Sequence, residues 1–380
     1  MRIKRWSGAL LGLTLALSAC GGGAESTSQE STSSAPAASS ASDSTEAEAS
    51  EAESQWPRKL TDMNGREVEL PKPAASVFGA GPPATTLIYT FGADQLAGWN
   101  GKLSGSLLPY LSDAAKNKPE LGRASGKDGN FNPETLLDKG VDVIFDAGDL
   151  GEQYRQMADD LQAQSGIPTM QFSTDLDKLP EVYRLMGQVF DDAERAEELA
   201  AYVERIWTEV EAKASTIADA DRVSVYYGQG DAGLATAGSG NIHARVIDMI
   251  GAKNAMGKAE KASGRMDIDA EALLAADPDW VIVLAPKDGS DVTTTPAFSE
   301  LRAVKDGKVL HSPMGPWPWM DGPPSVNQVL GVIWAAEAIY PDVYDFDVAK
   351  EVKEFYQLFY HVDLSDEDVA KLLEDSGFKG

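Results

Sequence analysis

Residues 191–217 read DDAERAEELAAYVERIWTEVEAKASTI and contain neither glycine nor proline. Apolar side chains recur there at three- and four-residue steps, which is the period of an amphipathic helix. They are Ala196, Leu199, Ala200, Val203, Ile206, Trp207 and Val210. At about 1.5 Å per residue, such a helix spans about 40 Å. The stretch therefore predicts one long helix near the middle of the chain.

On the N-terminal side of this helix, short apolar strands alternate with helical segments. Residues 60–71 contain two alternating runs joined by Asn64-Gly65, a strong signal for a β-hairpin. The pattern that follows predicts strands at 75–79, 95–98, 141–145 and 169–172, and helices at 84–91, 133–137 and 153–164. This alternation is typical of an α/β lobe with a mostly parallel sheet.

A second series on the C-terminal side repeats the scheme. It predicts strands at 222–227, 280–284 and 309–311, helices at 244–250, 270–276 and 325–338, and two final helices around 348–359 and 366–374. The expected fold class is therefore α/β, with two lobes of mostly parallel sheet bridged by a single long helix. We expect an N-terminal lobe at 56–175, the inter-lobe helix at 176–220 and a C-terminal lobe at 221–380.

The first twenty residues are similar to a bacterial lipoprotein signal peptide. Arg2, Lys4 and Arg5 precede an apolar run, and small residues lead into Cys20, the only cysteine of the chain. The resemblance implies that the Cys20 thiol carries a diacylglycerol after cleavage, which would hold the protein at the extracytoplasmic face of the cell membrane. Alternatively the run begins a membrane-spanning helix, but such a helix needs about 20 apolar residues, and glycines follow Cys20 directly.

Residues 21–55 are nearly all small or polar and include no aromatic residue. A segment of this composition cannot bury enough apolar surface to fold. We expect a disordered tether with an average reach of roughly 30–35 Å.

The composition excludes several classes of function. One cysteine allows no disulfide framework, thiolate cluster or Cys-x-x-Cys pair. The chain has 60 acidic and 33 basic residues and a formal net charge of −27. This charge repels nucleic acid and anionic lipid headgroups, and it makes a bare anion a less natural ligand. Contact with the membrane is therefore expected through the lipid alone.

Short motifs follow one another in a particular order along residues 58–345. They are Asp62-x-x-Gly65-Arg66-x-Val68-x-Leu70-Pro71, Phe91-Gly92-Ala93-Asp94-Gln95-Leu96-Ala97-Gly98, Leu121-Gly122, Asn132-Pro-Glu134-Thr-Leu-Leu, Val141-Asp142-Val-Ile, Gly251-Ala-Lys-Asn254, Ile268-Asp-Ala-Glu271-Ala-Leu-Leu, Asp277-Pro278-Asp279-Trp-Val-Ile and Leu301-x-Ala303-Val304-Lys305-x-Gly307-Lys308-Val309. This order resembles the iron-chelate, haem and cobalamin substrate-binding proteins of ABC importers. The resemblance implies two rigid lobes that hold a ligand between them and close only slightly on binding.

The same resemblance implies a permease-docking role for one glutamate in each lobe. The matching positions are Glu134 and Glu271, and in the family such glutamates meet arginines of the two permease subunits. Carboxylate–guanidinium pairs suit docking because they fix geometry as well as attraction. The alternative is an acid in the first turn of a helix, where the helix dipole favours it.

Ligand contacts are expected from loops at the strand ends, where open α/β sheets place their crevices. The candidates are Pro82, Thr85, Trp99 and Asn100 in the first lobe, and Tyr227, Gln229, His243, Arg265, Trp317 and Trp319 in the second. Trp317 and Trp319 stand among prolines in a loop, so helix or strand periodicity does not explain them. Their rings either offer flat area to a chelated ligand or cap the core of the lobe.

Three further features of the sequence bear on other functions. Gly228-x-Gly230-x-x-Gly233 matches a dinucleotide fingerprint, but no helical pattern follows it. The three histidines lie far apart in sequence, so we expect no metal site made by the protein alone, although His243 could complete the coordination of a chelated metal. Gly238-Ser239-Gly240 lacks the spacing of a hydrolase nucleophile elbow.

The sequence thus predicts a monomeric, non-enzymatic lipoprotein that binds an iron-siderophore or a related metal chelate for ABC permease subunits. No resident cofactor and no nucleic-acid partner are expected. Haem, a corrinoid or a nickel chelate is the alternative within this architecture, and an extracellular enzyme is the alternative outside it.

Overall fold

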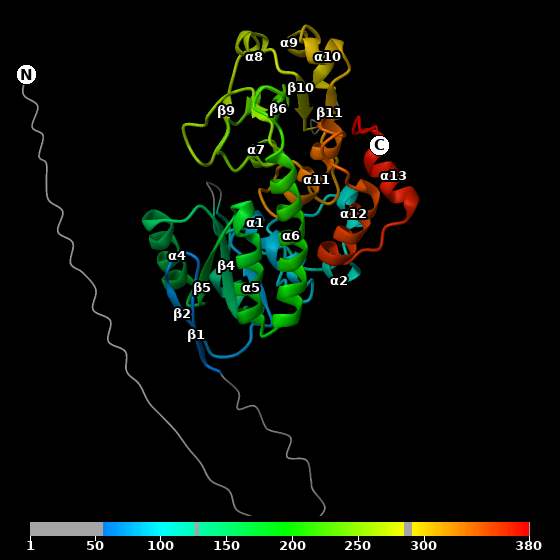
Figure 1. Cartoon of the computed structure of the whole chain (residues 1–380). Helices are drawn as coiled ribbons and strands as arrows, with labels where there is room; N and C mark the ends of the chain where they lie inside the picture. The colour runs from blue at the N-terminus through cyan, green and yellow to red at the C-terminus, as the bar shows by residue number, and fades with distance from the viewer. Residues whose placement is uncertain (1–55, 126–128, 285–290, 380) are drawn as a thin grey trace, which may run out of the picture. The chain divides into compact units, whose positions relative to one another are not determined.

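The structure, a computed structural model, describes residues 56–125, 129–284 and 291–379. The signal peptide, Cys20 and the tether predicted within residues 1–55 lie outside these residues. The described part of the chain folds into two α/β lobes, which confirms the expected fold class (Figure 1). No helix in this part has both the length and the hydropathy needed to cross a membrane.

The first lobe is built on a three-stranded parallel sheet in the order β3-β4-β5. Its elements are β1 (Arg58–Thr61), β2 (Glu67–Leu70), β3 (Val77–Gly79), α1 (Pro82–Phe91), α2 (Asp113–Lys116), α3 (Pro133–Asp138), β4 (Val143–Gly148), α4 (Glu152–Ser165), β5 (Thr169–Ser173) and α5 (Leu179–Phe190). Strands β1 and β2 form the predicted antiparallel hairpin, and Gly65 in its turn has φ +78°. That left-handed conformation explains why glycine stands there.

The prediction of a strand at 95–98 is wrong, because these residues form only one isolated β-bridge, between Leu96 and Val77. The chain then leaves β3 and pairs with another segment. The Trp99 N–H donates to the Pro119 carbonyl at 2.8 Å, and the Leu121 N–H donates to the Trp99 carbonyl at 2.8 Å. This second pairing ends the strand after a single residue.

The second lobe is built on a parallel sheet in the order β11-β10-β6-β8. Its elements are β6 (Ser224–Gly228), β7 (Ala235–Thr236), α7 (Arg245–Met249), β8 (Lys253–Asn254), β9 (Met266–Asp267), α8 (Ala270–Ala276), β10 (Trp280–Val283), α9 (Pro296–Ser299), α10 (Arg302–Lys305), β11 (Val309–His311) and α11 (Asn327–Ile339). Strands β7 and β9 form a separate antiparallel pair. Strand β10 is flanked by β6 and β11 and lies in the interior of the main sheet.

The predicted long helix is α6 (Ala193–Ala214), which runs beside both lobes in Figure 1. The side chain of Asp192 caps its N-terminus by accepting the Arg195 N–H at 3.0 Å. Residues 176–220 also hold α5, which packs along α6 and ends at Asp191 in a left-handed conformation with φ +58°. The segment expected to be one helix therefore contains two.

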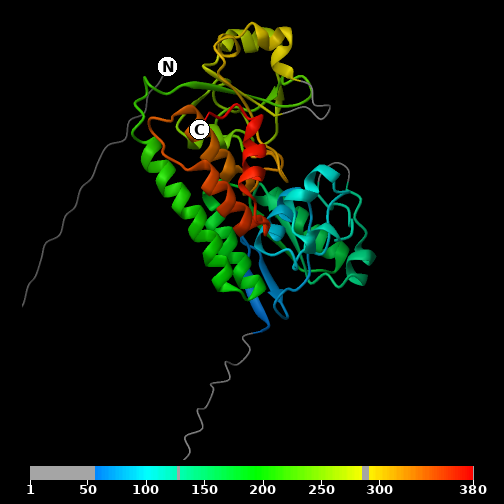
Figure 2. The same cartoon turned by 90° about the vertical axis from the view of Figure 1, so that its right-hand side faces the viewer.

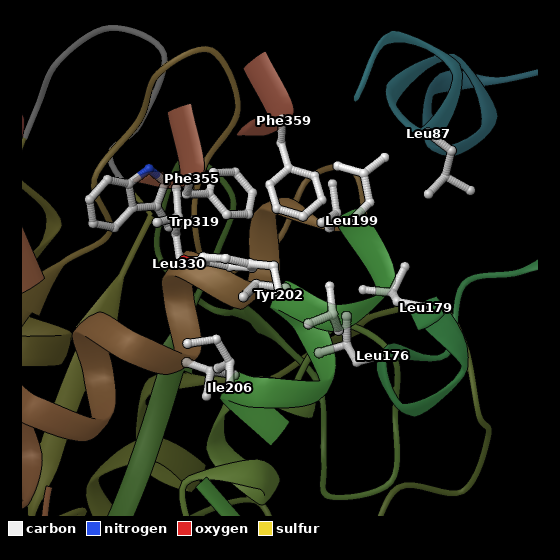
Figure 3. Packing of buried hydrophobic residues seen from close by; sticks show 14 of the residues in the cluster. Leu87, Leu176, Leu179, Leu199, Tyr202, Ile206, Trp319, Leu330, Phe355 and Phe359 are labelled. Carbon is white, nitrogen blue, oxygen red and sulfur yellow. The ribbon is translucent and has the colours of Figure 1, made fainter. Parts of the chain in front are cut away.

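The buried face of α6 contacts both lobes at once. Figure 3 shows Leu199 and Tyr202 of α6 between Leu176 and Leu179 on one side and Leu330 and Phe355 on the other. All of these side chains belong to a single hydrophobic cluster. One continuous core thus joins the two lobes through α6.

The C-terminal segment provides a second connection between the lobes. Helix α12 (Val348–Phe355) continues into a π turn at Tyr356–Tyr360, and α13 (Asp366–Glu374) follows (Figure 2). The rings of Tyr360 and Tyr89 of α1 stack with centroids 6.2 Å apart, and the Tyr89 hydroxyl donates to the Tyr360 carbonyl. The Arg195 guanidinium of α6 donates to the Leu358 carbonyl. The last helices are therefore tied to the first lobe as well as to the second.

A pH effect on stability is expected at this connection. Burial lowers the pKa of His361 below 6.5, and the charge of Arg195 lowers it further. The hydrogen bond from Nε2 to the Tyr89 carbonyl at 2.9 Å raises the pKa, as do the charges of Asp94 and Glu198, but these effects are smaller in sum. The unfolded chain then binds more protons, so stability is full above about pH 6.5 and falls as pH drops toward the folded pKa. Urea unfolding at pH 7.5 and 5.5 measures this loss.

The matched variant is His361→Asn. His361 has φ +57°, and asparagine tolerates that left-handed conformation better than most residues. The variant should lose less stability than the wild type between the two pH values. An equal loss in both proteins would show that other groups carry the pH dependence.

Candidate functional site

The carboxyl ends of the strands in the first lobe meet loops of the second lobe. Asp149 directly follows β4 and accepts a hydrogen bond from the Ser263 hydroxyl at 2.6 Å. Asp175 follows β5 and pairs with Arg245 of α7 at 2.6 Å. These two contacts mark where the loops at the strand ends of the two lobes come together.

Four of the residues predicted in the second lobe belong to one polar cluster. Arg265 Nη1 donates to Gln229 Oε1 at 2.7 Å, and His243 Nδ1 lies 2.8 Å from Asp321 Oδ2. Tyr227 stands near the end of β6, two residues before Gln229, and Asn241 links the two pairs by bonding the His243 N–H and the Gly264 carbonyl next to Arg265. The cluster therefore draws on the loops after β6 and β11 and on the connections around α7 and β9.

Two buried amides hold this cluster in place. Gln328 Nε2 donates to the carbonyls of Ile242 and Met320 at 3.1 and 3.0 Å, so it fixes the residues that precede His243 and Asp321. Asn241 Oδ1 accepts the His243 N–H at 3.0 Å. Its Nδ2 donates to the carbonyls of Lys261 and Gly264 at 3.0 and 2.8 Å, next to Arg265. The cluster is thus organised before any ligand arrives.

The buried carboxylate of Asp321 and the neutral phenol of Tyr227 determine the electrostatics of this cluster. Asp321 is 2% exposed, and only one of its carboxylate oxygens has a partner within the described residues. Burial and, next, the Asp321 charge raise the pKa of Tyr227 well above 10, while Arg265 opposes the shift. Tyr227 therefore stays a neutral phenol at physiological pH, able to donate its proton. Its hydroxyl and Gln229 Nε2 are enclosed and have no partner in the described part of the chain.

A pocket of about 450 Å³ adjoins this cluster. Asn241, Ser263 and Arg265 line it, together with Lys258, Glu260 and Lys261. Three basic side chains against one acidic side chain make the pocket locally cationic on an acidic protein. Such a pocket attracts anionic ligands.

The candidates of the first lobe lie in a different environment. The Thr85 hydroxyl is buried and donates to Asn100 Oδ1 at 2.6 Å, and Asn100 Nδ2 donates to the carbonyls of Gly79 and Gly122 at 2.8 and 2.9 Å. Pro82 is half-buried at the start of α1. Thr85 and Asn100 therefore hold the loop after β3 to its neighbours, and ligand contact by these residues stays a prediction.

The candidate tryptophans lie in an aromatic cluster. Trp99 is 5% exposed, its Nε1 donates to the Ala115 carbonyl at 2.9 Å, and its ring lies 6.4 Å from the half-buried Trp317. Trp317 also meets Tyr89 and Tyr360, at 5.8 and 5.4 Å between centroids. Trp319 is 0% exposed and belongs to the main core. Trp319 is thus a core residue, and ligand contact by Trp317 and Trp319 stays a prediction.

The two docking candidates lie at equivalent places on the surface. Glu134 of α3 and Glu271 of α8 are both exposed, each in the first turn of its helix. Neither carboxylate has an ion-pair partner among the salt bridges of the described residues. They are therefore available to an external partner.

Sequence reasoning did not single out Asp321, Asn241 or Gln328. Asp321 lies 78 residues from its partner His243, so no local pattern connects the two. Residues 56–125, 129–284 and 291–379 contain no group of three or more His, Cys, Asp or Glu side chains suited to a metal ion.

Comparisons with known proteins identify the family to which this chain is similar. A profile described as "Periplasmic binding protein" matches residues 106–314. The molybdate-binding protein MolA of Haemophilus influenzae is 28% identical over 204 residues, which cover 51% of this chain and 55% of MolA. The match thus spans about half the length of that curated relative.

Two solved structures cover more of the chain. An ABC transporter solute binding protein from Sulfurospirillum deleyianum has 30% identity and a TM-score of 0.75, covering 84% of this chain and 99% of that one. A periplasmic solute binding protein from Veillonella parvula has 24% identity and a TM-score of 0.68, with 84% and 98% covered. The chain therefore belongs to the periplasmic binding protein family, among the solute-binding proteins of ABC transporters.

Proposed function

We propose that this protein captures an anionic metal chelate, of which a ferric siderophore is the first candidate, and delivers it to the permease of an ABC importer. The observation that carries the proposal is the preorganised cluster of Tyr227, Gln229 and Arg265 beside a cationic pocket. Arg265, Lys258 and Lys261 line this pocket and suit the anionic oxygens of a siderophore chelate. The protein binds its ligand and performs no chemistry on it.

His243 adds a nitrogen donor to this site. Because Asp321 accepts at Nδ1, the proton of a neutral imidazole resides there and leaves the lone pair on Nε2. A chelate with a free coordination position could use this nitrogen. The alternatives of haem, a corrinoid or a nickel chelate are compatible with the same donor.

Molybdate is a second candidate ligand. The 28% identical relative is a molybdate-binding protein, and the pocket carries Lys258, Lys261 and Arg265. Three cationic side chains that can donate hydrogen bonds suit a tetrahedral oxyanion. The overall charge of −27 opposes a bare anion, whereas the local charge of the pocket favours it.

The proposal includes attachment at the membrane through Cys20 and a monomeric state. The sequence around Cys20 supports lipidation, and residues 21–55 would leave the folded part free to move beside its permease. Loss of lipid labelling in Cys20→Ser tests the attachment. Sedimentation of the purified protein tests the monomer.

Arg265→Ala is expected to weaken binding of the physiological ligand about tenfold, because it removes a charged donor from the pocket. Thermal-shift measurements against ferric siderophores, haem, cobalamin, nickel–histidine and molybdate identify that ligand first, since a ligand at 100 times its Kd stabilises by about 2.7 kcal/mol. Calorimetric titration of the variant then gives the change in affinity.

Lys350→Ala, which removes an exposed cation on α12, is the control and should bind like the wild type. Failure of every tested compound to stabilise the wild type would contradict the proposed ligand class. Unchanged affinity in Arg265→Ala would show that the ligand lies elsewhere.

A further inference from the structure

We infer that Leu137 and Leu274 are apolar anchors of a two-part docking surface, each set beside the glutamate of its lobe and each received by one half of a two-fold symmetric permease. This inference rests on the proposed function, because it takes the permease as the partner. It adds to that function a hydrophobic contact that charge pairing alone does not supply.

The two surfaces belong to one repeated structural unit. Helices α3 and α8 are each capped by a side-chain oxygen: Asn132 Oδ1 accepts the Glu134 and Thr135 N–H groups at 2.9 and 3.4 Å, and Asp269 Oδ1 accepts the Ala272 N–H at 2.8 Å. Glu134 and Glu271 are each the second residue of their helix. The cap residues and the glutamates are separated by the same number of positions along the chain.

The equivalence continues through the turn into the next strand. Gly140 and Asp277, at matching positions, both take left-handed conformations, with φ +67° and +35°. Two residues later, Asp142 accepts the Ala75 N–H at 2.9 Å, and Asp279 accepts the Ser224 N–H at 2.8 Å. Each unit is thus fixed to the strand that lies beside its own, so the two helices hold the same position relative to their sheets.

Within this repeat, neighbouring leucines have opposite environments. Leu136 and Leu273 are both 0% exposed and fill the core of their lobes. Leu137 and Leu274, the next residues, are 55% and 40% exposed. They are among the few large hydrophobic side chains exposed to this degree in the described part of the chain. The buried leucines already hold the helices, so the fold does not require the exposed ones.

The position of each exposed leucine suits a shared contact with its glutamate. Glu134 and Leu137, and likewise Glu271 and Leu274, are three residues apart, which places both side chains on one face of the helix. An exposed leucine beside an unpaired carboxylate fits an apolar pocket that has a cation at its edge. Two such faces fit a partner that offers the same pocket twice, as two equivalent permease subunits do.

The test measures binding of the full chain to its purified ABC transporter in lipid nanodiscs. Leu137→Ser and Leu274→Ser should each weaken binding about tenfold, and the double variant should weaken it further, because buried apolar anchors dominate interface energies. Their urea midpoints should match the wild type, since exposed side chains contribute little to stability. Met157→Ser, which removes a 48% exposed side chain from α4, is the matched control.

Three results would overturn the inference. If the leucine double variant binds like the wild type while Glu134→Ala with Glu271→Ala binds weakly, docking stands and the leucine anchors are wrong. If the leucine substitutions instead abolish a wild-type dimer in sedimentation, the surfaces serve a second copy of the chain. If neither pair changes transporter binding, the docking part of the proposed function fails as well.

Discussion

Replacing Trp319 by alanine is expected to lower the free energy of unfolding by about 3–5 kcal/mol, the usual cost of removing a large aromatic side chain from a core. Its indole is 0% exposed and packs in the cluster that joins both lobes. Figure 3 shows it beside Phe355, near the residues of α6. Urea unfolding followed by far-ultraviolet circular dichroism measures the loss.

Two further variants make this result specific. Trp319→Phe keeps a ring in the same space and should lose much less stability than the alanine variant. Trp317→Ala should also cost less, because its ring is only half-buried. A Trp319→Ala protein as stable as the wild type would mean that the indole is not part of the core.

Glu134→Ala combined with Glu271→Ala is expected to reduce ligand uptake by cells at least tenfold while leaving ligand affinity unchanged. Both carboxylates are exposed on helices outside the cluster around Arg265, so their removal should not alter the binding site. Uptake of radiolabelled ligand and calorimetric titration of the purified protein separate the two effects.

Glu194→Ala is the matched control for this experiment. Glu194 is also the second residue of a capped helix, α6, and is exposed. If the glutamates only complement helix dipoles, worth about 0.3–1 kcal/mol each, all three positions should behave alike and uptake should persist. Normal uptake by the double variant would contradict docking through Glu134 and Glu271.

Local patterns were enough to predict most of the fold. The apolar period of residues 191–217 predicted α6, and Asn64-Gly65 predicted the hairpin of β1 and β2. Both signals depend on neighbours in sequence. The strand predicted at 95–98 does not form, because Trp99 pairs with residues 119–121 instead. A local sequence pattern does not contain information about such a distant pairing partner.

The candidate site was predictable only in part. Tyr227 stands near the end of strand β6, and Gln229 and His243 stand in the glycine-rich connection that follows it, a place where ligand contacts are common. The structure pairs Gln229 with Arg265 and His243 with Asp321. Asp321 and Gln328 come from a distant loop and from a buried helix face. A single buried polar residue gives no periodic signal, so only the tertiary contacts reveal its role.

The double connection between the lobes has a consequence for transport. Because helix α6 and the contact between Tyr89 and Tyr360 both join the halves, we expect the halves to move little relative to each other. The permease would then meet nearly the same outer surface on the ligand-free protein and on the ligand-bound protein. Vacant copies would compete for the importer, and a cell that makes them in large excess would slow its own supply of the nutrient.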